Sequence, residues 1–252
     1  MPLHFLLEGA AGEPAEASTA VVGDAVTLVG AEAHHAVSVR RVRVGEEVTV
    51  GDGRGAWLTG ECEEVAPKRV VVRITQRTDI PAPTPRIVLV QALAKGDRDE
   101  LAVQAATELG VDGIVPWQAS RSVSRWDAAK AEKGRARWAT IAREAAKQAH
   151  RAWLPQVSAA TTTNDLVARA AASRVLVLEP TAPQRLTGVV LDAADDRDVV
   201  LVVGPEGGIA PDELERLEAA GAQLVRLGDT VLRTSTAGPA ALSVVSAILG
   251  RW

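Results

Sequence analysis

Two glycine-containing segments near the C-terminus have the residue types of a small-molecule site. In "LVVGPEGGIAPDEL" (201–214), an apolar run passes into a glycine corner and then into a segment that begins with Pro211. Glycine lets a ligand approach the backbone closely. The corner lacks the GxGxxG spacing and the lysine of phosphate loops, and its charged residues Glu206, Asp212 and Glu213 are all acidic. We therefore expect either a purely structural turn or a ligand that carries no phosphate.

The second segment, "LGDTVLRTSTAG" (227–238), follows the strand-like run "AQLVRL" (222–227) and reads as a polar loop. Pro239 is predicted to begin a final helix, which has apolar residues at core spacing. In an open parallel sheet, ligands bind at the carboxyl ends of the strands. Loops that follow two consecutive strands can therefore build one site.

The elements that must position these loops divide near residue 80. Short alternating runs with glycine turns precede it and predict a small antiparallel barrel or sheet. "TDIPAPTPR" (78–86) has three prolines at alternating positions and is typical of a stiff linker. Continuous Val/Ile/Leu runs then alternate with helical patterns, which indicates a parallel sheet covered on both faces. We predict an α/β protein with a β domain at 1–77, a linker at 78–86 and a second domain at 87–252.

Composition limits the chemistry. The 252 residues are 47% hydrophobic, which suffices for a packed core, and they include one cysteine, Cys62, so neither an internal disulfide nor a cysteine-based zinc site is expected. We expect no metal. The N-terminus has no signal-peptide pattern, and no apolar run is long enough to span a membrane. A cytoplasmic protein without membrane contact is expected.

Basic residues concentrate in the middle of a chain whose net charge is −4. Residues 121–151 hold nine Lys or Arg and three acids, with tryptophans inside or beside them, so this stretch is a candidate RNA-binding surface. On a helix expected over 134–150, three cations recur every four residues; a solvated helix surface is the alternative. The candidate RNA-binding residues are Arg40, Arg41, Arg43, Arg121, Arg143, Lys147 and Arg151.

The pair "GPEGG" and "LGDTVLRTSTA" resembles the cofactor loops of the SPOUT methyltransferases, specifically of the ribosomal RNA small subunit methyltransferase E family, which methylates N3 of a uridine in 16S rRNA. "HHAVSVRRVRVGEEVTVGDGRG" (34–55) is similar to the PUA-like N-terminal segment of that family. "AVQAATELGVDGIVPWQASRSV" (102–123) and "IAREAAKQAHRAWLPQV" (141–157) resemble two further family segments. Two positions differ from the family pattern. Ala105 stands where the family usually has Lys, and Ser235 stands where many members have Glu.

The resemblance implies a C-terminal SPOUT domain with a deep trefoil knot and a PUA-like, RNA-binding N-terminal domain. It also implies S-adenosylmethionine as cofactor, a homodimer, and 16S rRNA of the small ribosomal subunit as partner. The residues expected at the cofactor are Leu178, Glu179, Val203, Gly204, Pro205, Glu206, Gly207, Leu227, Gly228, Leu232, Thr234, Ser235, Thr236 and Ala237.

Uridine N3 attacks well only as an anion, so either a base removes its proton or a cation stabilises the uridinate. None of the four histidines lies in the C-terminal loops, which favours Arg233 as the cation; a salt bridge that holds the loop is the alternative. Other functions remain open at this point: methylation of a ribose 2′-hydroxyl, RNA binding without catalysis, or a Rossmann-type enzyme. The last would need a glycine fingerprint, which "VLVQALAKGDRDE" (88–100) lacks.

Overall fold

The computed structural model describes residues 2–7, 9, 15–192 and 194–252. The chain forms two compact units, Met1–Ala82 with Ala146–Leu154, and Pro83–Ala145 with Pro155–Trp252. The division near residue 82 falls within the proline-rich segment. Residues 146–154 pack with the first unit, although the sequence pattern assigns them to the C-terminal domain.

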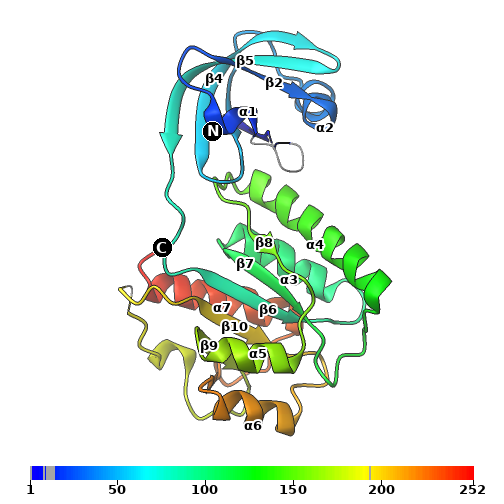
Figure 1. Cartoon of the computed structure of the whole chain (residues 1–252), viewed down its shortest axis with the longest axis vertical. Helices are drawn as coiled ribbons and strands as arrows, with labels where there is room; N and C mark the ends of the chain where they lie inside the picture. The colour runs from blue at the N-terminus through cyan, green and yellow to red at the C-terminus, as the bar shows by residue number, and fades with distance from the viewer. Residues whose placement is uncertain (1, 8, 10–14, 193) are drawn as a thin grey trace. The chain divides into compact units, whose positions relative to one another are not determined.

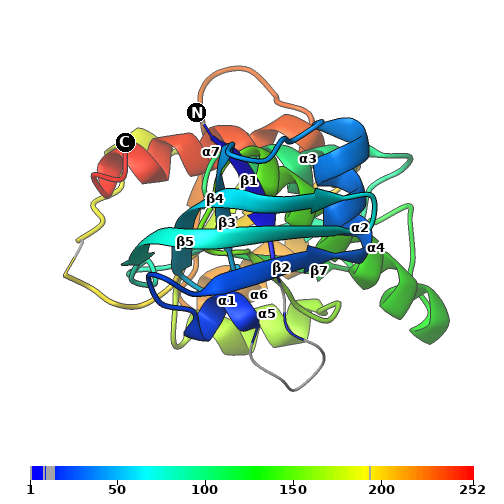
Figure 2. The same cartoon turned by 90° about the horizontal axis from the view of Figure 1, so that it is seen from above.

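The first unit is built on one five-stranded sheet, in the order β1-β3-β4-β5-β2 (Figure 2). All neighbours are antiparallel except β1 and β3, which run parallel, so the predicted all-antiparallel arrangement is wrong for this pair. Alternate residues of β5, including Val70, Val72 and Ile74, are buried in the core. The elements are β1 (Leu3–Leu6), α1 (Glu16–Thr19), β2 (Ala25–Val29), α2 (Gly30–His34), the π-helical turn η1 (His35–Val39), β3 (Glu47–Gly51), β4 (Ala56–Ala66) and β5 (Arg69–Asp79).

The second unit is the predicted α/β domain with a parallel sheet (Figure 1). Its six strands follow the order β11-β9-β10-β6-β7-β8. The elements are β6 (Ile87–Ala92), α3 (Arg98–Glu108), β7 (Gly113–Trp117), α4 (Ala128–Gln148, which ends in residues of the first unit), β8 (Gln156–Val157), α5 (Thr163–Ala170), β9 (Arg174–Leu178), the 3-10 turn η2 (Leu186–Gly188), β10 (Val199–Val203), α6 (Pro211–Ala219), β11 (Gln223–Val225) and α7 (Thr234–Ile248).

Both faces of this sheet are buried, which explains the continuous apolar runs in its strands. In β10, Val199, Leu201 and Val203 face one core with residues of α3, α4 and α7. Val200 and Val202 face the opposite core, which α5 and α6 cover. Because every position of such a strand is covered, no polar alternation remains in its sequence.

The final helix begins earlier than predicted. α7 starts at Thr234, and Pro239 lies inside it instead of at its first position. Residues 234–238, predicted as loop, therefore form the first turn of α7 and bring a helix N-terminus to the carboxyl edge of the sheet. The trefoil knot stays a prediction.

Candidate active site

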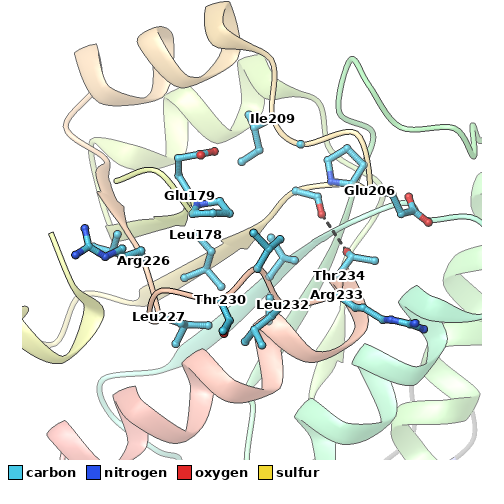
Figure 3. A pocket seen from close by; sticks show the side chains of 18 of the residues that line it. Leu178, Glu179, Glu206, Ile209, Arg226, Leu227, Thr230, Leu232, Arg233 and Thr234 are labelled. Carbon is cyan, nitrogen blue, oxygen red and sulfur yellow. Dashed lines mark hydrogen bonds between the residues drawn. The ribbon is translucent and has the colours of Figure 1, made fainter. Parts of the chain in front are cut away.

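A cavity of about 440 Å³ lies at the carboxyl edge of the parallel sheet (Figure 3). The last residues of three strands line it: Leu178 of β9, Val203 of β10 and Val225 of β11. The loops that follow these strands supply most of the remaining wall. Both glycine-containing segments therefore contribute to one site, as their places after consecutive strands predict.

All residues predicted at the cofactor line this cavity except Gly207, Ser235 and Thr236. Gly207 lies beside Arg121, and the Thr236 hydroxyl donates back to the Arg233 carbonyl within the first turn of α7. Sequence reasoning missed eight lining residues, of which all but Arg98 lie in the same segments as the predicted ones. The additional lining residues are Arg98, Pro180, Gly208, Ile209, Val225, Arg226, Thr230 and Val231.

A buried hydrogen-bond chain fixes the corner beneath the cavity. The fully buried Gln91, at the end of β6, donates from Nε2 to the Thr234 hydroxyl at 2.8 Å. The Thr234 hydroxyl then donates to the Gly204 carbonyl at 3.0 Å, as the dashed line in Figure 3 marks. These two hydrogen bonds join the start of α7 to the residue that follows β10, so they hold together the two loops that form the cavity.

The glycines of the corner differ in what surrounds them. A Cβ added at Gly204 would lie 2.6 Å from Ile209 Cγ1, which no side chain tolerates without movement. A Cβ at Gly207 would meet nothing closer than Arg121 Cβ at 3.6 Å, an ordinary contact. Gly204 is therefore required for close packing of the corner, whereas the structure gives no such reason for Gly207.

The charged residues of the glycine corner are all acidic in the sequence, but the cavity wall as a whole also contains arginines. Arg98, Arg226 and Arg233 line it with Glu179 and Glu206. Arg98 donates to Glu206 Oε1 at 3.0 Å, and Arg226 donates to the Ala182 and Pro183 carbonyls at 2.7 and 3.0 Å. Two of the three arginines therefore have protein partners already.

Glu206 is held as an anion. Burial alone would raise the pKa of this carboxyl, but hydrogen bonds from its own N–H, from the Lys95 N–H and from the Arg98 guanidinium lower it. The Lys95 N–H lies 2.9 Å from Oε1. The carboxylate therefore links the glycine corner to the loop before α3.

The loop after β11 offers free backbone donors to the cavity. Within the described residues, none of the backbone N–H groups from 227 to 232 donates a hydrogen bond to another residue. Leu227, Gly228, Thr230 and Leu232 from this loop all line the cavity. Unpaired donors at a concave, largely apolar wall are what a small polar ligand needs for orientation.

Arg233, the predicted catalytic cation, is exposed at the edge of the cavity. Figure 3 shows its side chain extending away from the centre of the pocket, on the same side as Glu206. Its guanidinium forms no ion pair with any residue that the structure describes. The alternative role, a salt bridge that holds the loop, therefore has no acidic partner among these residues. The charge is therefore available to a ligand.

The predicted stripe of Arg143, Lys147 and Arg151 does not form one exposed face. Lys147 is buried, and its Nζ donates to Glu32 Oε1 at 2.8 Å. α4 ends at Gln148 and His150 adopts a left-handed conformation (φ 53°), so Arg151 lies beyond the helix. Arg143 pairs with Glu144 at 2.7 Å. Lys147 is therefore not a surface contact for RNA, and helical spacing does not relate Arg151 to the other two residues.

The other predicted RNA contacts are exposed. Arg40, Arg41 and Arg43 lie on the surface of the first unit between η1 and β3, and Arg121 lies on the second unit beside Gly207. In the described part of the chain, no three or more His, Cys, Asp or Glu side chains cluster as metal ligands do. The described helices include none with the length and apolar character that a membrane crossing requires.

Comparison with known proteins agrees with this site. Residues 81–246 match the RNA methyltransferase domain family, and residues 28–75 match the RNA methyltransferase PUA domain family. The chain is 44% identical to ribosomal RNA small subunit methyltransferase E of Mycobacterium bovis, over 91% of this chain and 89% of that protein. It is 32% identical to the Bacillus subtilis protein of the same name, over 87% of this chain and 89% of that protein.

The structure is similar to the crystal structure of a ribosomal RNA small subunit methyltransferase E from Neisseria gonorrhoeae bound to S-adenosyl methionine. The TM-score is 0.83 at 27% sequence identity, over 98% of both chains. The likeness therefore extends over nearly the whole chain. The chain belongs to the ribosomal RNA small subunit methyltransferase E family.

Proposed function

We propose that this protein transfers a methyl group from S-adenosylmethionine to N3 of a uridine in 16S rRNA of the small ribosomal subunit. The observation that carries the proposal is the cavity formed by the two glycine-containing loops in a chain of this family. The Neisseria gonorrhoeae relative, which has the same fold, was crystallised with S-adenosyl methionine.

The residues present fit this cofactor. A volume of about 440 Å³ lies within the range of small-molecule sites. Apolar side chains of Leu178, Val203, Ile209, Val225 and Leu227 suit the faces of an adenine ring, and the free N–H groups of 227–232 suit its polar edge and the ribose. Of the three arginines that line the wall, Arg98 and Arg226 already donate to protein groups. This cofactor carries no phosphate and so does not need them.

The bound cofactor would supply a methyl group already activated by its sulfonium, so the protein needs mainly to position the acceptor. The walls of the cavity would hold the cofactor, and the open side next to Glu206 and Arg233 would receive the uridine. Arg233 would stabilise negative charge on the uridine as its N3 proton leaves, because a fixed cation lowers the free energy of a nearby anion. Glu206, held as an anion by Arg98, would keep the corner in place.

Methylation of a ribose 2′-hydroxyl by the same fold is the second candidate. It needs a group that activates a hydroxyl, whereas the open side of the cavity presents a cation without a described partner. That cation favours an acceptor that is itself acidic, as uridine N3 is.

The resemblance further implies a homodimer and a trefoil knot, which we include in the proposal. In α7, Val244, Ile248 and Leu249 are partly exposed although Val245 is fully buried, so the helix has apolar surface beyond its core face. A second copy of the chain would cover it.

Mass spectrometry of nucleosides from 16S rRNA tests the proposed function. A strain that lacks this gene should lose 3-methyluridine from its 16S rRNA, and the wild-type gene should restore it. Loss of a 2′-O-methylated nucleoside instead would establish the second candidate, and an unchanged nucleoside profile would contradict both.

A further inference from the structure

Three segments carry exposed cations close to the glycine corner. Lys95 follows β6, Arg121 and Arg125 follow β7, and Arg233 precedes α7; all four are exposed. We refer to these four residues as the cationic rim. They lie far apart in sequence, so only the fold brings them together.

Hydrogen bonds place three of the four rim residues beside the glycine corner. The Lys95 N–H donates to Glu206 Oε1 at 2.9 Å, and Arg121 Nη1 donates to the Gly207 carbonyl at 3.3 Å. Arg233 directly precedes Thr234, whose hydroxyl donates to the Gly204 carbonyl. Lys95, Arg121 and Arg233 therefore lie beside the glycine corner that lines the cavity, and Arg125 lies beside Ser120 on the same loop as Arg121.

The charges of the rim are not neutralised by carboxylates of the described residues. Arg121 and Arg125 donate to neutral carbonyls, those of Gly207 and Ser120. The side chains of Lys95 and Arg233 form no hydrogen bond or ion pair within the described parts of the chain. Among the acids close to the rim in structure or sequence, Glu206 pairs with Arg98 and Glu213 accepts hydrogen bonds from Ser120. Asp127, two residues after Arg125, pairs with Lys130, and Asp97 lies two residues after Lys95. The rim thus keeps a net positive charge in a protein whose total is −4.

The loop that carries Arg121 is fixed at its start. Ser120 donates from its N–H and from its hydroxyl to the buried Glu213, at 3.0 and 2.8 Å. Burial alone would raise the pKa of Glu213, but hydrogen bonds from Thr163, Ser120 and Ala210 lower it, so it remains an anion. This anchor ties the loop to the first turn of α6.

The same loop is fixed at its end by Trp126. The Trp126 N–H donates to Gln118 Oε1 at 2.8 Å, and its ring meets Trp138 edge-to-face at 5.5 Å between centroids. Gly134 gives the ring room, since a Cβ there would lie 2.4 Å from it. Two anchors therefore hold Arg121 and Arg125 in place before any ligand arrives, which lowers the entropic cost of binding.

We propose that the cationic rim binds the phosphates of RNA on either side of the nucleotide that enters the cavity. This proposal rests on the proposed function and adds where the substrate backbone is held. Arginine and lysine are the side chains that contact nucleic-acid phosphates, and such contacts position the strand without reading its sequence. Arg121 and Arg125 each use only one N–H group on a carbonyl, so their other donors remain for phosphate oxygens.

The test is the salt dependence of binding to small ribosomal subunits from a strain that lacks this gene. Each phosphate contact that is lost lowers the slope of log K against log salt by about 0.7 to 0.9. The triple variant Lys95→Gln, Arg121→Gln, Arg125→Gln should therefore bind more weakly, with a slope flatter by about two. These three residues do not line the cavity, so its affinity for S-adenosylmethionine should stay within about twofold, a difference well below 1 kcal/mol.

Arg86, Arg174 and Arg197 supply a matched control, because they lie at the amino ends of β6, β9 and β10, at the opposite edge of the sheet. Their triple Gln variant removes the same charge and should keep the wild-type slope, as should Lys95→Arg, Arg121→Lys, Arg125→Lys. A wild-type slope in the rim Gln variant, or an equal loss in the amino-edge control, would contradict phosphate binding by the cationic rim but not the proposed function. Absence of salt-dependent binding by the wild-type protein would overturn the proposed function as well.

Discussion

Arg233 is the one candidate for the chemical step that combines exposure at the cavity with a charge unpaired among the described residues. Arg233→Gln should lower kcat by about 10²- to 10³-fold, the usual loss when one group that stabilises an anion is removed. The affinity for S-adenosylmethionine should change little. Single-turnover methylation of small subunits, with separate calorimetric titration of the cofactor, measures both.

The pH profile separates charge stabilisation from a structural role of Arg233. Without the cation, the pKa of the bound uridine rises, so the rate of the Gln variant should recover as the pH rises. Arg233→Lys keeps the charge and should retain more activity than Gln. Equal rate losses for both variants at every pH would contradict the assignment.

Gly204 and Gly207 differ in what a side chain would meet, and this difference predicts unequal effects. Gly204→Ala places a Cβ 2.6 Å from Ile209, so the corner must shift and cofactor affinity should fall at least tenfold. Gly207→Ala meets only an ordinary contact, so affinity should stay within about threefold, which is less than 1 kcal/mol. Calorimetric titration of both variants, with thermal unfolding to verify folding, makes the comparison. Equal losses would mean that both glycines contact the ligand.

Thr234 links Gln91 to Gly204, and its removal should loosen the cavity. Thr234→Val leaves a buried amide and a carbonyl without their partner, which costs about 1 to 3 kcal/mol. Part of that cost should appear as weaker binding of S-adenosylmethionine, and part as lower thermal stability. Thr236→Val is the matched control, because the exposed Thr236 hydroxyl donates only within its own turn and does not line the cavity. Equal effects of the two substitutions would show that the hydrogen bonds of Thr234 with Gln91 and Gly204 do not support the cavity.

At the scale of elements, a buried ion pair within the first unit joins α2 to the last residues of α4. The side chains of Lys147 and Glu32 are 8% and 10% exposed, and their Nζ and Oε1 atoms lie 2.8 Å apart. Lys147→Met removes the cation from a buried carboxylate, which typically destabilises a protein by about 3 to 5 kcal/mol. Hydrogen exchange of the full chain should show this loss in the first unit.

Replacing both partners tests whether the loss of stability comes from removing one charge of the pair and leaving the other. Lys147→Met combined with Glu32→Leu should recover a large part of the stability, because both charges of the pair are then removed from the buried site together. A single substitution that costs less than about 0.5 kcal/mol, the usual effect of a change on the surface, would show that the pair is unimportant.

Strand patterns predicted the architecture of the second unit well, because continuous apolar runs arise only where both faces of a sheet are covered. Two elements escaped that reasoning for physical reasons. β8 has only two residues, Gln156 and Val157, too few for any period. α7 begins five residues before Pro239, since tertiary hydrogen bonds at Thr234 hold its first turn.

The loops of the site were predictable because glycine and strand ends mark them. The hydrogen bonds that hold these loops in place could not be predicted. Gln91 and Thr234 lie 143 positions apart in sequence, and Ser120 and Glu213 lie 93 apart, so no local pattern connects them. Helical spacing also led us to place Lys147 in an exposed stripe of cations. The spacing of residues cannot distinguish an exposed lysine from one that pairs with a buried glutamate 115 positions away.

At the scale of the whole molecule, the partly exposed apolar side chains of α7 predict a homodimer. Sedimentation equilibrium at micromolar concentration should give twice the 26.4 kDa mass of the chain. Ile248→Glu, which places a charge on the partly exposed apolar surface, should shift the protein to monomers and reduce methylation. Ala247→Glu, one residue earlier and exposed, should leave the dimer intact. A fully active monomer would contradict this prediction.

The most direct test of the proposed activity is the identity of the nucleoside that the purified protein makes. S-adenosylmethionine labelled in its methyl group, small subunits from a strain that lacks this gene, and the wild-type protein are combined, and the digested 16S rRNA is separated by chromatography. The label should appear in 3-methyluridine, about one per subunit, and the Gly204→Ala variant should transfer far less. Label in a 2′-O-methylated nucleoside, or no transfer by a protein that binds both cofactor and subunit, would contradict it.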